Sequence, residues 1–165
     1  MSVWFCMTAA KIFTPLEPTP LGIKFRLAEA ADQRALHATC YPDKPFAPFE
    51  TMFTRSLRRQ KNGRGLYLLS LKQDKIVGSA QLIHHGKRGE LADIVVATAE
   101  RGQGIGTALI RLLEQEATLR GWRPLEIGVE SANGRALALY RRLGYQIKRE
   151  ILIHTGQTAL ILFKL

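Results

Sequence analysis

A glycine-rich segment, Arg-Gly-Gln-Gly-Ile-Gly-Thr at residues 101–107, most constrains the fold of this chain. It follows an apolar stretch, residues 90–96, that is typical of a strand. Apolar residues at helical spacing then predict a helix over residues 105–117. The unpaired amide groups and the positive dipole end of that helix would lie at the glycines, where an anion can approach the main chain closely. The segment therefore predicts a phosphate-binding turn between a strand and a helix.

Two common phosphate-binding patterns do not match this segment. A Walker A loop requires a lysine directly after its last glycine, and Thr107 follows Gly106 here. A dinucleotide-binding fingerprint requires glycines at offsets 0, 2 and 5, whereas these glycines are at positions 102, 104 and 106. Nucleotide hydrolysis and NAD binding are therefore disfavoured, and a purely structural glycine turn is the remaining alternative.

The pattern around the segment predicts an α/β (α+β) fold with a mixed, mostly antiparallel sheet of six to seven strands and about four helices. Alternation predicts strands at 23–27, 66–72, 75–85, 90–96, 125–129, 145–153 and 158–165. Helices are expected after a cap at Asp32, over 49–60, over 105–117 and from Asn133 to Leu143. Strand, helix and strand between Glu90 and Glu130 form a crossover, which implies one locally parallel pair.

The 165 residues fit one domain, which we place at 23–165 after a proline-containing N-terminal arm at 1–22. A formal charge of +10 favours anionic partners in general. Cys6 and Cys40 lack metal-ligand spacing, so we expect no metal site and a reducing, cytoplasmic location. The apolar run near the N-terminus is too short to span a bilayer, and no membrane association is expected.

Two motifs in the second half of the chain resemble the GNAT acyltransferase superfamily. Arg101-x-x-Gly104-x-Gly106 is similar to the pyrophosphate motif of that family. Asn133-x-x-Ala136-x-x-Leu139-Tyr140, followed by Leu143-Gly144-Tyr145, is similar to its second motif. Phe25-Arg26-Leu27-Ala28 with Asp32 resembles the first strand and helix cap, so the resemblance covers residues 23–165 and implies the GNAT fold.

The resemblance implies that the chain is an N-acetyltransferase with acetyl-CoA as its co-substrate. The diphosphate would bind the amides of the glycine-rich segment, and the pantetheine arm would pair with the backbone of the preceding strand. The implied cofactor-binding residues are Ile94, Val96, Arg101, Gly102, Gln103, Gly104, Ile105, Gly106, Thr107, Asn133 and Tyr140. Asn133 has a second interpretation as a helix N-cap.

The resemblance also implies catalytic residues for the attack of a primary amine on the thioester. Tyr140 takes the position of the acid that protonates the CoA sulfur, and its alternative interpretation is a core aromatic residue. For the base, Glu90 is at a position used by some relatives that acetylate histones, and Asp93 is nearer the pantetheine stretch. On an ideal strand these two carboxylates face opposite sides. An ordered water chain is a further alternative to both.

The acceptor is expected to be a small neutral or zwitterionic amine, or a protein amine on an acidic partner, because a basic chain repels polycations. A homodimer is allowed but not indicated. The basic stretch at 55–64 keeps a second hypothesis open, a non-catalytic acyl-CoA sensor or a nucleic-acid or ribosome-associated module. No aromatic residues are interleaved with these arginines, so nucleic acid is the weaker choice.

Overall fold

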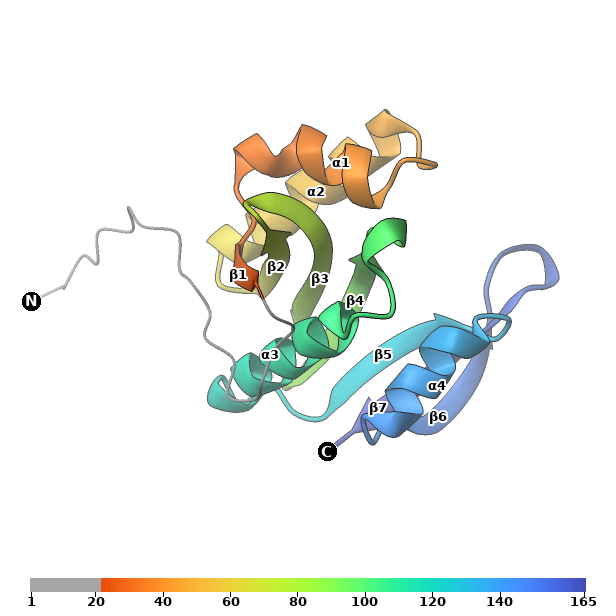
Figure 1. Ribbon diagram of the computed structural model, residues 1–165. Helices are drawn as coiled ribbons and strands as arrows, with labels where there is room; N and C mark the ends of the chain where they lie inside the picture. The colour runs from red at the N-terminus through yellow and green to blue at the C-terminus, as the bar shows by residue number, and fades with distance from the viewer. Residues whose placement is uncertain (1–21) are drawn as a thin grey trace, which may run out of the picture.

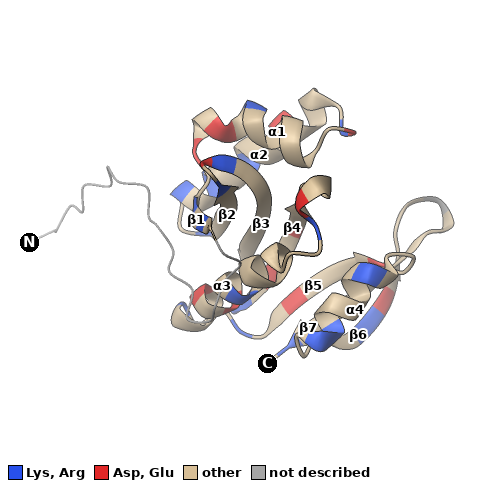
Figure 2. Cartoon of the chain, in the orientation of Figure 1, with Lys and Arg blue, Asp and Glu red and all other residues tan. Residues whose placement is uncertain are grey.

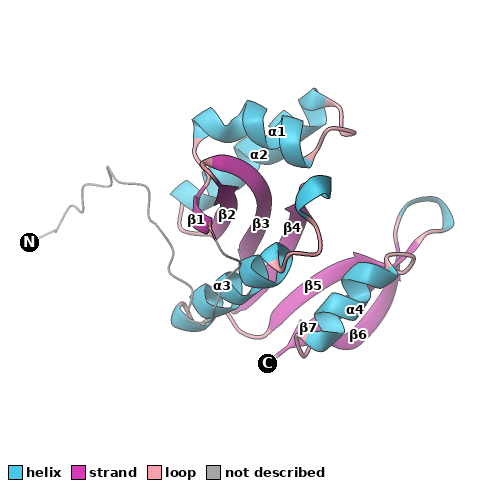
Figure 3. Cartoon of the chain, in the orientation of Figure 1, coloured by secondary structure: helices cyan, strands magenta, loops and turns pink. Residues whose placement is uncertain are grey.

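Helices cover both faces of a mixed seven-stranded sheet in the computed structural model, which describes residues 22–165 (Figure 1, Figure 3). The strands are β1 (Ile23–Leu27), β2 (Gly65–Lys72), β3 (Lys75–His85), β4 (Arg88–Val96), β5 (Leu125–Glu130), β6 (Gln146–Leu152) and β7 (Thr158–Lys164). The helices are α1 (Gln33–Cys40), α2 (Phe46–Lys61), α3 (Ile105–Leu119) and α4 (Gly134–Arg142), with short 3₁₀ turns η1 (Ala30–Asp32), η2 (Thr98–Glu100) and η3 (His154–Gly156). The predicted fold class is confirmed. Residues 1–21 of the predicted arm, with Cys6, lie outside the described residues.

The sheet has the strand order β1-β2-β3-β4-β5-β7-β6, and α3 forms the crossover between β4 and β5. Those two strands are parallel, as predicted, and the other neighbouring pairs among the described strands are antiparallel. The β4–β5 ladder is short: it pairs Gly89 with Leu125, Glu90 with Glu126 and Leu91 with Ile127, and is not recorded beyond them. From Ala92 onward the two strands therefore diverge (Figure 1).

Each face of the sheet has its own hydrophobic core. One cluster joins α3 and α4 to the sheet and includes the fully buried Leu109, Leu113 and Leu162. The other lies under α1 and α2 and includes Phe49 and Phe53. Burial of this apolar surface is the main stabilising contribution to such a layered fold. Within residues 22–165, no helix combines the length and apolar character that a membrane span requires.

Two local expectations are corrected by the structure. The Asp32 side chain does not cap α1; its carboxylate instead accepts two hydrogen bonds of 2.7 Å from the Arg26 guanidinium and one of 2.8 Å from the Glu29 amide. Helix α2 begins at Phe46 rather than at residue 49, and Pro48 lies in its first turn. Proline is tolerated there because amides of the first turn have no helical partner.

Candidate active site

The glycine-rich segment forms the turn into α3, as the sequence predicts. Gly102 and Gly104 have φ values of +81° and +82°, a left-handed conformation that side chains strain. Gly104 is the N-cap of α3, and no side chain caps this end of the helix. The amides of the first turn are therefore left for a ligand, at the positive end of the helix dipole. This geometry suits a phosphate or diphosphate group.

A cavity of about 530 Å³ lies against this turn and extends between β4 and α4. Its walls come from three parts of the chain: β4 and the turn after it, the start of α3, and α4. The lining residues are Ile94, Val95, Val96, Glu100, Arg101, Gly102, Gly104, Ile105, Gly106, Thr107, Asn133, Arg135, Ala136, Leu139, Tyr140 and Arg142. All the cofactor-binding residues expected from the sequence therefore line one cavity, except Gln103. Arg135 and Arg142, which sequence reasoning did not single out, add two exposed cations to its rim.

The side chain of Gln103 forms hydrogen bonds with Glu100 and Lys72 instead of lining the cavity. Its amide nitrogen donates a hydrogen bond of 3.0 Å to Glu100, and its oxygen accepts one of 3.3 Å from the Lys72 ammonium. Lys72 also forms an ion pair of 2.7 Å with Glu100, and this contact holds the pKa of that carboxyl below its usual range. Because Glu100 lines the cavity, Lys72 neutralises a negative charge beside the predicted phosphate site. Sequence reasoning missed this pair, whose members lie on different elements.

The divergence of β4 from β5 leaves one edge of β4 without a strand partner over residues 92–96. On its other edge β4 pairs with β3, where the register shifts at a bulge between Ser79 and Gln81. Ile94 and Val96 pack toward the α3 side, and Val95 packs toward the α1 and α2 side. At this edge the Val96 oxygen accepts a hydrogen bond of 3.1 Å from Nε of Arg101. The backbone groups that have no strand partner can bind an extended, amide-containing ligand in the way that an added strand would.

Tyr140 lies on α4, where it both packs in the core and lines the cavity. It is 7% exposed, and its ring contacts Tyr145 edge to face with the centroids 6.3 Å apart. Burial raises the pKa of the Tyr140 hydroxyl, so it stays protonated at neutral pH and is able to donate a proton. The two interpretations of this residue, core aromatic and site residue, are thus compatible.

Asn133 likewise combines its two interpretations. Its side-chain oxygen accepts a hydrogen bond of 3.1 Å from the amide of Ala136, which makes it the N-cap of α4. The same residue lines the cavity. Its amide nitrogen carries no hydrogen bond to another described residue and is left for a ligand.

The bulge in β4 also orients Asp93. This residue has φ +49°, and its carboxylate accepts a hydrogen bond of 2.8 Å from the side-chain amide of Gln81. Gln81 faces α2, because its amide nitrogen also contacts the Met52 sulfur at 3.5 Å. Desolvation raises the pKa of the Asp93 carboxyl; the nearby Lys44 lowers it and Glu90 raises it further. A carboxylate with a raised pKa is a suitable general base.

The expectation that Glu90 and Asp93 face opposite sides is wrong. Directly paired residues point to one face of a sheet, and the register pairs Glu90 with Ile83, two residues after Gln81. Glu90 is thus on the Gln81 face, and the left-handed residue in the bulge brings the Asp93 carboxylate to the same side. The Glu90 carboxylate is in hydrogen-bond contact with the exposed imidazole of His85 at 2.7 Å, so it already has a partner.

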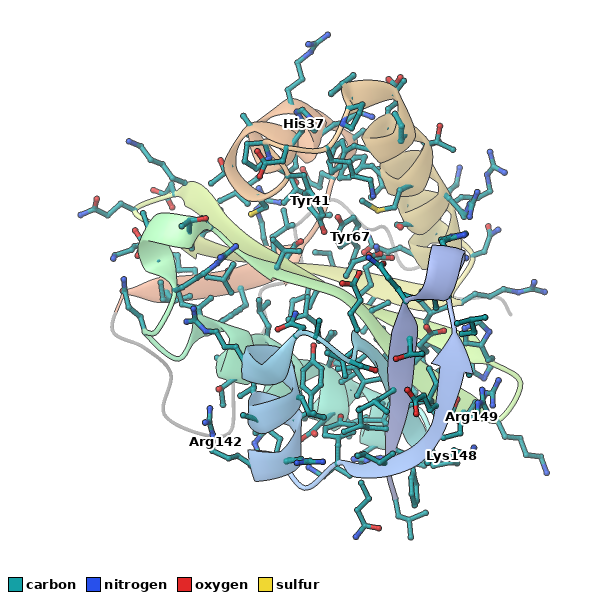
Figure 4. All side chains as sticks on the ribbon, turned by 90° about the vertical axis from the view of Figure 1, so that its right-hand side faces the viewer. His37, Tyr41, Tyr67, Arg142, Lys148 and Arg149 are labelled. Atoms are coloured by element: carbon teal, nitrogen blue, oxygen red, sulfur yellow. The ribbon has the colours of Figure 1, made fainter. Side chains whose placement is uncertain are left out.

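The hydroxyl groups of Tyr41, Tyr67 and Ser79 lie near Asp93; Tyr41 and Tyr67 are labelled in Figure 4. The Tyr41 hydroxyl is 3.5 Å from both the Ser79 hydroxyl and the backbone oxygen of Asp93, and burial raises its pKa to about 12. The Tyr67 hydroxyl is buried with no hydrogen-bond partner among the described residues. This polar group inside a largely apolar layer was not predicted, although the polar Ser79 and Gln81 within an apolar strand pattern were a signal for it.

Residues 30–145 match the Acetyltransferase (GNAT) family. The chain belongs to this family. A GNAT relative, mycothiol acetyltransferase of Nocardia farcinica, is 34% identical over 90 residues, which cover 54% of this chain and 28% of that protein. The curated relatives that this chain matches are thus considerably longer than the matched part. The relatives that carry a specific name are acetyltransferases.

Solved GNAT structures share the fold over most of the chain. The ribosomal-protein-alanine N-acetyltransferase of Brucella melitensis superimposes with a TM-score of 0.73 at 25% identity, covering 85% of this chain and 98% of that chain. A ribosomal L7/L12 alpha-N-protein acetyltransferase in complex with coenzyme A gives a TM-score of 0.76 at 15% identity, covering 93% and 97%. GNAT relatives therefore include structures that contain coenzyme A.

Proposed function

We propose that this GNAT chain transfers an acetyl group from acetyl-CoA to a primary amine, by direct attack in a ternary complex. The observation that carries the proposal is the single cavity that runs from the free amides at the start of α3 to Tyr140, along the unpaired edge of β4. An elongated ligand with a diphosphate at one end and an amide-rich arm at the other matches that sequence of surfaces.

In this proposal each part of acetyl-CoA has a stated binding surface. The diphosphate binds the amides of residues 101–107, and the remaining phosphate interacts with Arg135 and Arg142 at the rim. The pantetheine arm pairs with the backbone at Ile94 and Val96. In the proposal the thioester lies between the bulge of β4 and Tyr140, so that Asp93 acts on the attacking amine and Tyr140 acts on the CoA sulfur.

The proposed reaction moves two protons. The neutral amine attacks: its nitrogen lone pair forms the bond to the thioester carbon, and Asp93 accepts the proton that the nitrogen then loses. The carbon–sulfur bond breaks, the Tyr140 hydroxyl donates its proton to the leaving thiolate, and the proton held by Asp93 passes through solvent to restore the Tyr140 hydroxyl. We prefer Asp93 to Glu90 as the base, because desolvation raises the pKa of Asp93 and because Glu90 is held by His85.

The test is CoA release, followed with a thiol reagent, across a panel of small amines and peptide α-amines, together with calorimetric binding of acetyl-CoA. Initial rates measured at several concentrations of both substrates should give intersecting lines, as a ternary complex requires. Parallel lines would indicate a covalent acyl-enzyme and overturn the direct-attack mechanism. Tight acetyl-CoA binding without turnover of any amine would favour the alternative of a non-catalytic sensor.

A further inference from the structure

The sheet face on the α1 and α2 side is left partly uncovered at β5, β7 and β6. Helices α1 and α2 pack on β2 and β3, at the other end of the sheet (Figure 1). The register places Phe163 beside Glu126 and Ile161 beside Gly128 on this face, and both apolar side chains are half-buried in the described structure. This face of the sheet continues from β5 onto the Glu90 end of β4. It is therefore an open, partly apolar surface that begins at the candidate catalytic site.

Four cations border this surface, and we call them the basic row: Arg59, Arg88, Lys148 and Arg149. Arg88 and Lys148 contact the carboxylate of Glu126, Arg88 at 3.3 Å and Lys148 at 2.5 Å. Arg149 pairs with Ile161 in the register and so points to the same face. Arg59, on α2, is near enough to lower the pKa of Asp93. Lys148 and Arg149 are visible on β6 in Figure 4, and the Lys and Arg positions along β6 in Figure 2.

The acids on this surface do not balance the basic row. Glu126 serves two cations, and those contacts hold its pKa below the usual range, so it remains ionised. Glu90, at the β4 edge of the surface, contacts the imidazole of His85 at 2.7 Å. Among residues 22–165 no ion pair within 4 Å involves Arg59 or Arg149, although Arg149 is near enough to help lower the pKa of Glu126. Glu130 is on the same face of β5 as Glu126, but the three cations Arg88, Lys148 and Arg149 all lie near the one carboxylate of Glu126. The part of the surface around Glu126 therefore carries an excess of positive charge that is complementary to an anionic partner.

The spacing between the basic row and Asp93 suits an extended peptide. Asp93 and Glu90 are three residues apart on β4, which is about 10 Å along a strand. Glu126, where Arg88 and Lys148 meet, lies across from Glu90 on the neighbouring strand, about 5 Å further across the sheet. A peptide whose α-amine is at Asp93 would bring its third to fifth residues beside the basic row, since an extended residue spans about 3.3 Å.

We propose that the acceptor is the N-terminal segment of a polypeptide with acidic side chains at about its third to fifth positions. This inference rests on the proposed acetyl transfer and specifies its substrate class. The α-amine reacts beside Asp93, the following main chain crosses the open face over Ile161 and Phe163, and the acidic side chains pair with the basic row. A small amine would use the first of these contacts alone, so the open face would serve no purpose in its recognition.

The experiment compares two synthetic peptides as acceptors for the full chain with acetyl-CoA. One has a free α-amine and aspartates at positions three to five, and the other has asparagines there. We expect kcat/KM for the acidic peptide to be about five to ten times higher, as two or three exposed ion pairs would give. The preference should decline as salt is added, because exposed ion pairs are screened.

Variants then locate the preference on the basic row. Arg149→Glu and the milder Arg149→Gln should reduce the acidic-to-neutral ratio of kcat/KM toward one. Arg141→Glu, an exposed arginine on α4 across the sheet, should keep the ratio of the unaltered chain. Equal use of both peptides by the unaltered chain, or acetylation of a small amine with no peptide turnover, would overturn this inference and leave the proposed function standing. Failure to bind acetyl-CoA would instead overturn the proposed function.

Discussion

The side-chain amide of Gln81 donates a 2.8 Å hydrogen bond to the carboxylate of Asp93 across a bulge between β3 and β4. Because the bond uses one carboxylate oxygen, the other is left for an acceptor amine. The bond also fixes the orientation of a side chain whose backbone has the left-handed φ of +49°. Asparagine and aspartate are among the few residues that tolerate this conformation, so a test of Asp93 can preserve the backbone.

Asp93→Asn is expected to lower kcat by about 10²-fold or more, the usual contribution of a general base. The measurement is CoA release with a good acceptor at saturating acetyl-CoA. The matched control is Glu90→Gln, which removes the other candidate carboxylate. If Glu90→Gln lost the activity and Asp93→Asn retained it, the assignment of the base would be reversed.

The pH dependence should follow the raised pKa of Asp93. The base must be deprotonated, so kcat/KM should fall on acidification with a midpoint above the ordinary range of an aspartate. Because the pKa of Asp93 is higher in the folded than in the unfolded state, its ionised form destabilises the folded state. The free energy of unfolding therefore falls as pH rises through the folded-state pKa. Asp93→Asn should therefore not lower the melting temperature at neutral pH, whereas a purely structural carboxylate would give a lower one.

Tyr140→Phe is expected to lower kcat by about 10²-fold while it leaves KM for acetyl-CoA within about twofold, since the lost hydroxyl acts on the leaving thiolate. Tyr145→Phe is the matched control, because its buried hydroxyl belongs to the neighbouring ring and does not line the cavity. Steady-state kinetics of both variants gives the comparison. If kcat were unchanged in Tyr140→Phe, Tyr140 would not be the proton donor and would contribute only to packing.

Lys72→Met should raise KM for acetyl-CoA several-fold without a matching change in kcat. The change leaves the Glu100 carboxylate uncompensated beside the predicted diphosphate site, where it would repel the phosphates. Adding Glu100→Gln to the same chain should restore most of the affinity, and Lys72→Arg should resemble the unaltered protein. No recovery in the double variant would mean that Lys72 acts through another contact.

Gly106→Ala separates cofactor binding from folding. A β-carbon at this position would meet Val96 at 3.7 Å, an ordinary contact, and alanine favours a helix, so the melting temperature should be unchanged or higher. The added methyl group would face the cavity and is expected to weaken acetyl-CoA binding. Gly104→Ala should instead lower both the melting temperature and the affinity for acetyl-CoA, because the left-handed backbone of this N-cap disfavours a side chain. An unchanged affinity of Gly106→Ala for acetyl-CoA would argue against the predicted phosphate-binding turn.

The predictable part of the site is local in sequence. The spacing of the glycines at 102, 104 and 106 predicted a phosphate-binding turn, and the tyrosine-containing motif on α4 carried a role through its resemblance to the GNAT family. Apolar patterns and turn residues likewise predicted the seven strands, and the strand–helix–strand order between Glu90 and Glu130 predicted the parallel pair. Strand ends and helix starts were less accurate, as at Phe46, because a proline within a first turn does not end a helix.

The remaining part depends on long-range register. No glycine or proline marks the bulge at Asp93, so treating β4 as an ideal strand put Asp93 and Glu90 on opposite faces. The partners Gln81 and Asp93 are on neighbouring strands. Lys72 and Glu100 are in contact although β3 and β4 lie between them in the sequence. Side-chain pairs of this kind follow from how strands align, which periodicity within one segment does not specify.

The short β4–β5 ladder makes the cohesion of the two halves of the sheet depend on what fills the gap between them. Three ladder pairs, the ion pair of Arg88 with Glu126 and the packing of α3 are among the contacts that join β1–β4 to β5–β7–β6. A pantetheine arm bound along β4 would take the place of a strand partner in the gap. Bound acetyl-CoA would then stabilise the native state in proportion to the logarithm of the acetyl-CoA concentration. In a cell, the resistance of this chain to unfolding and proteolysis would thus vary with the supply of its acyl donor.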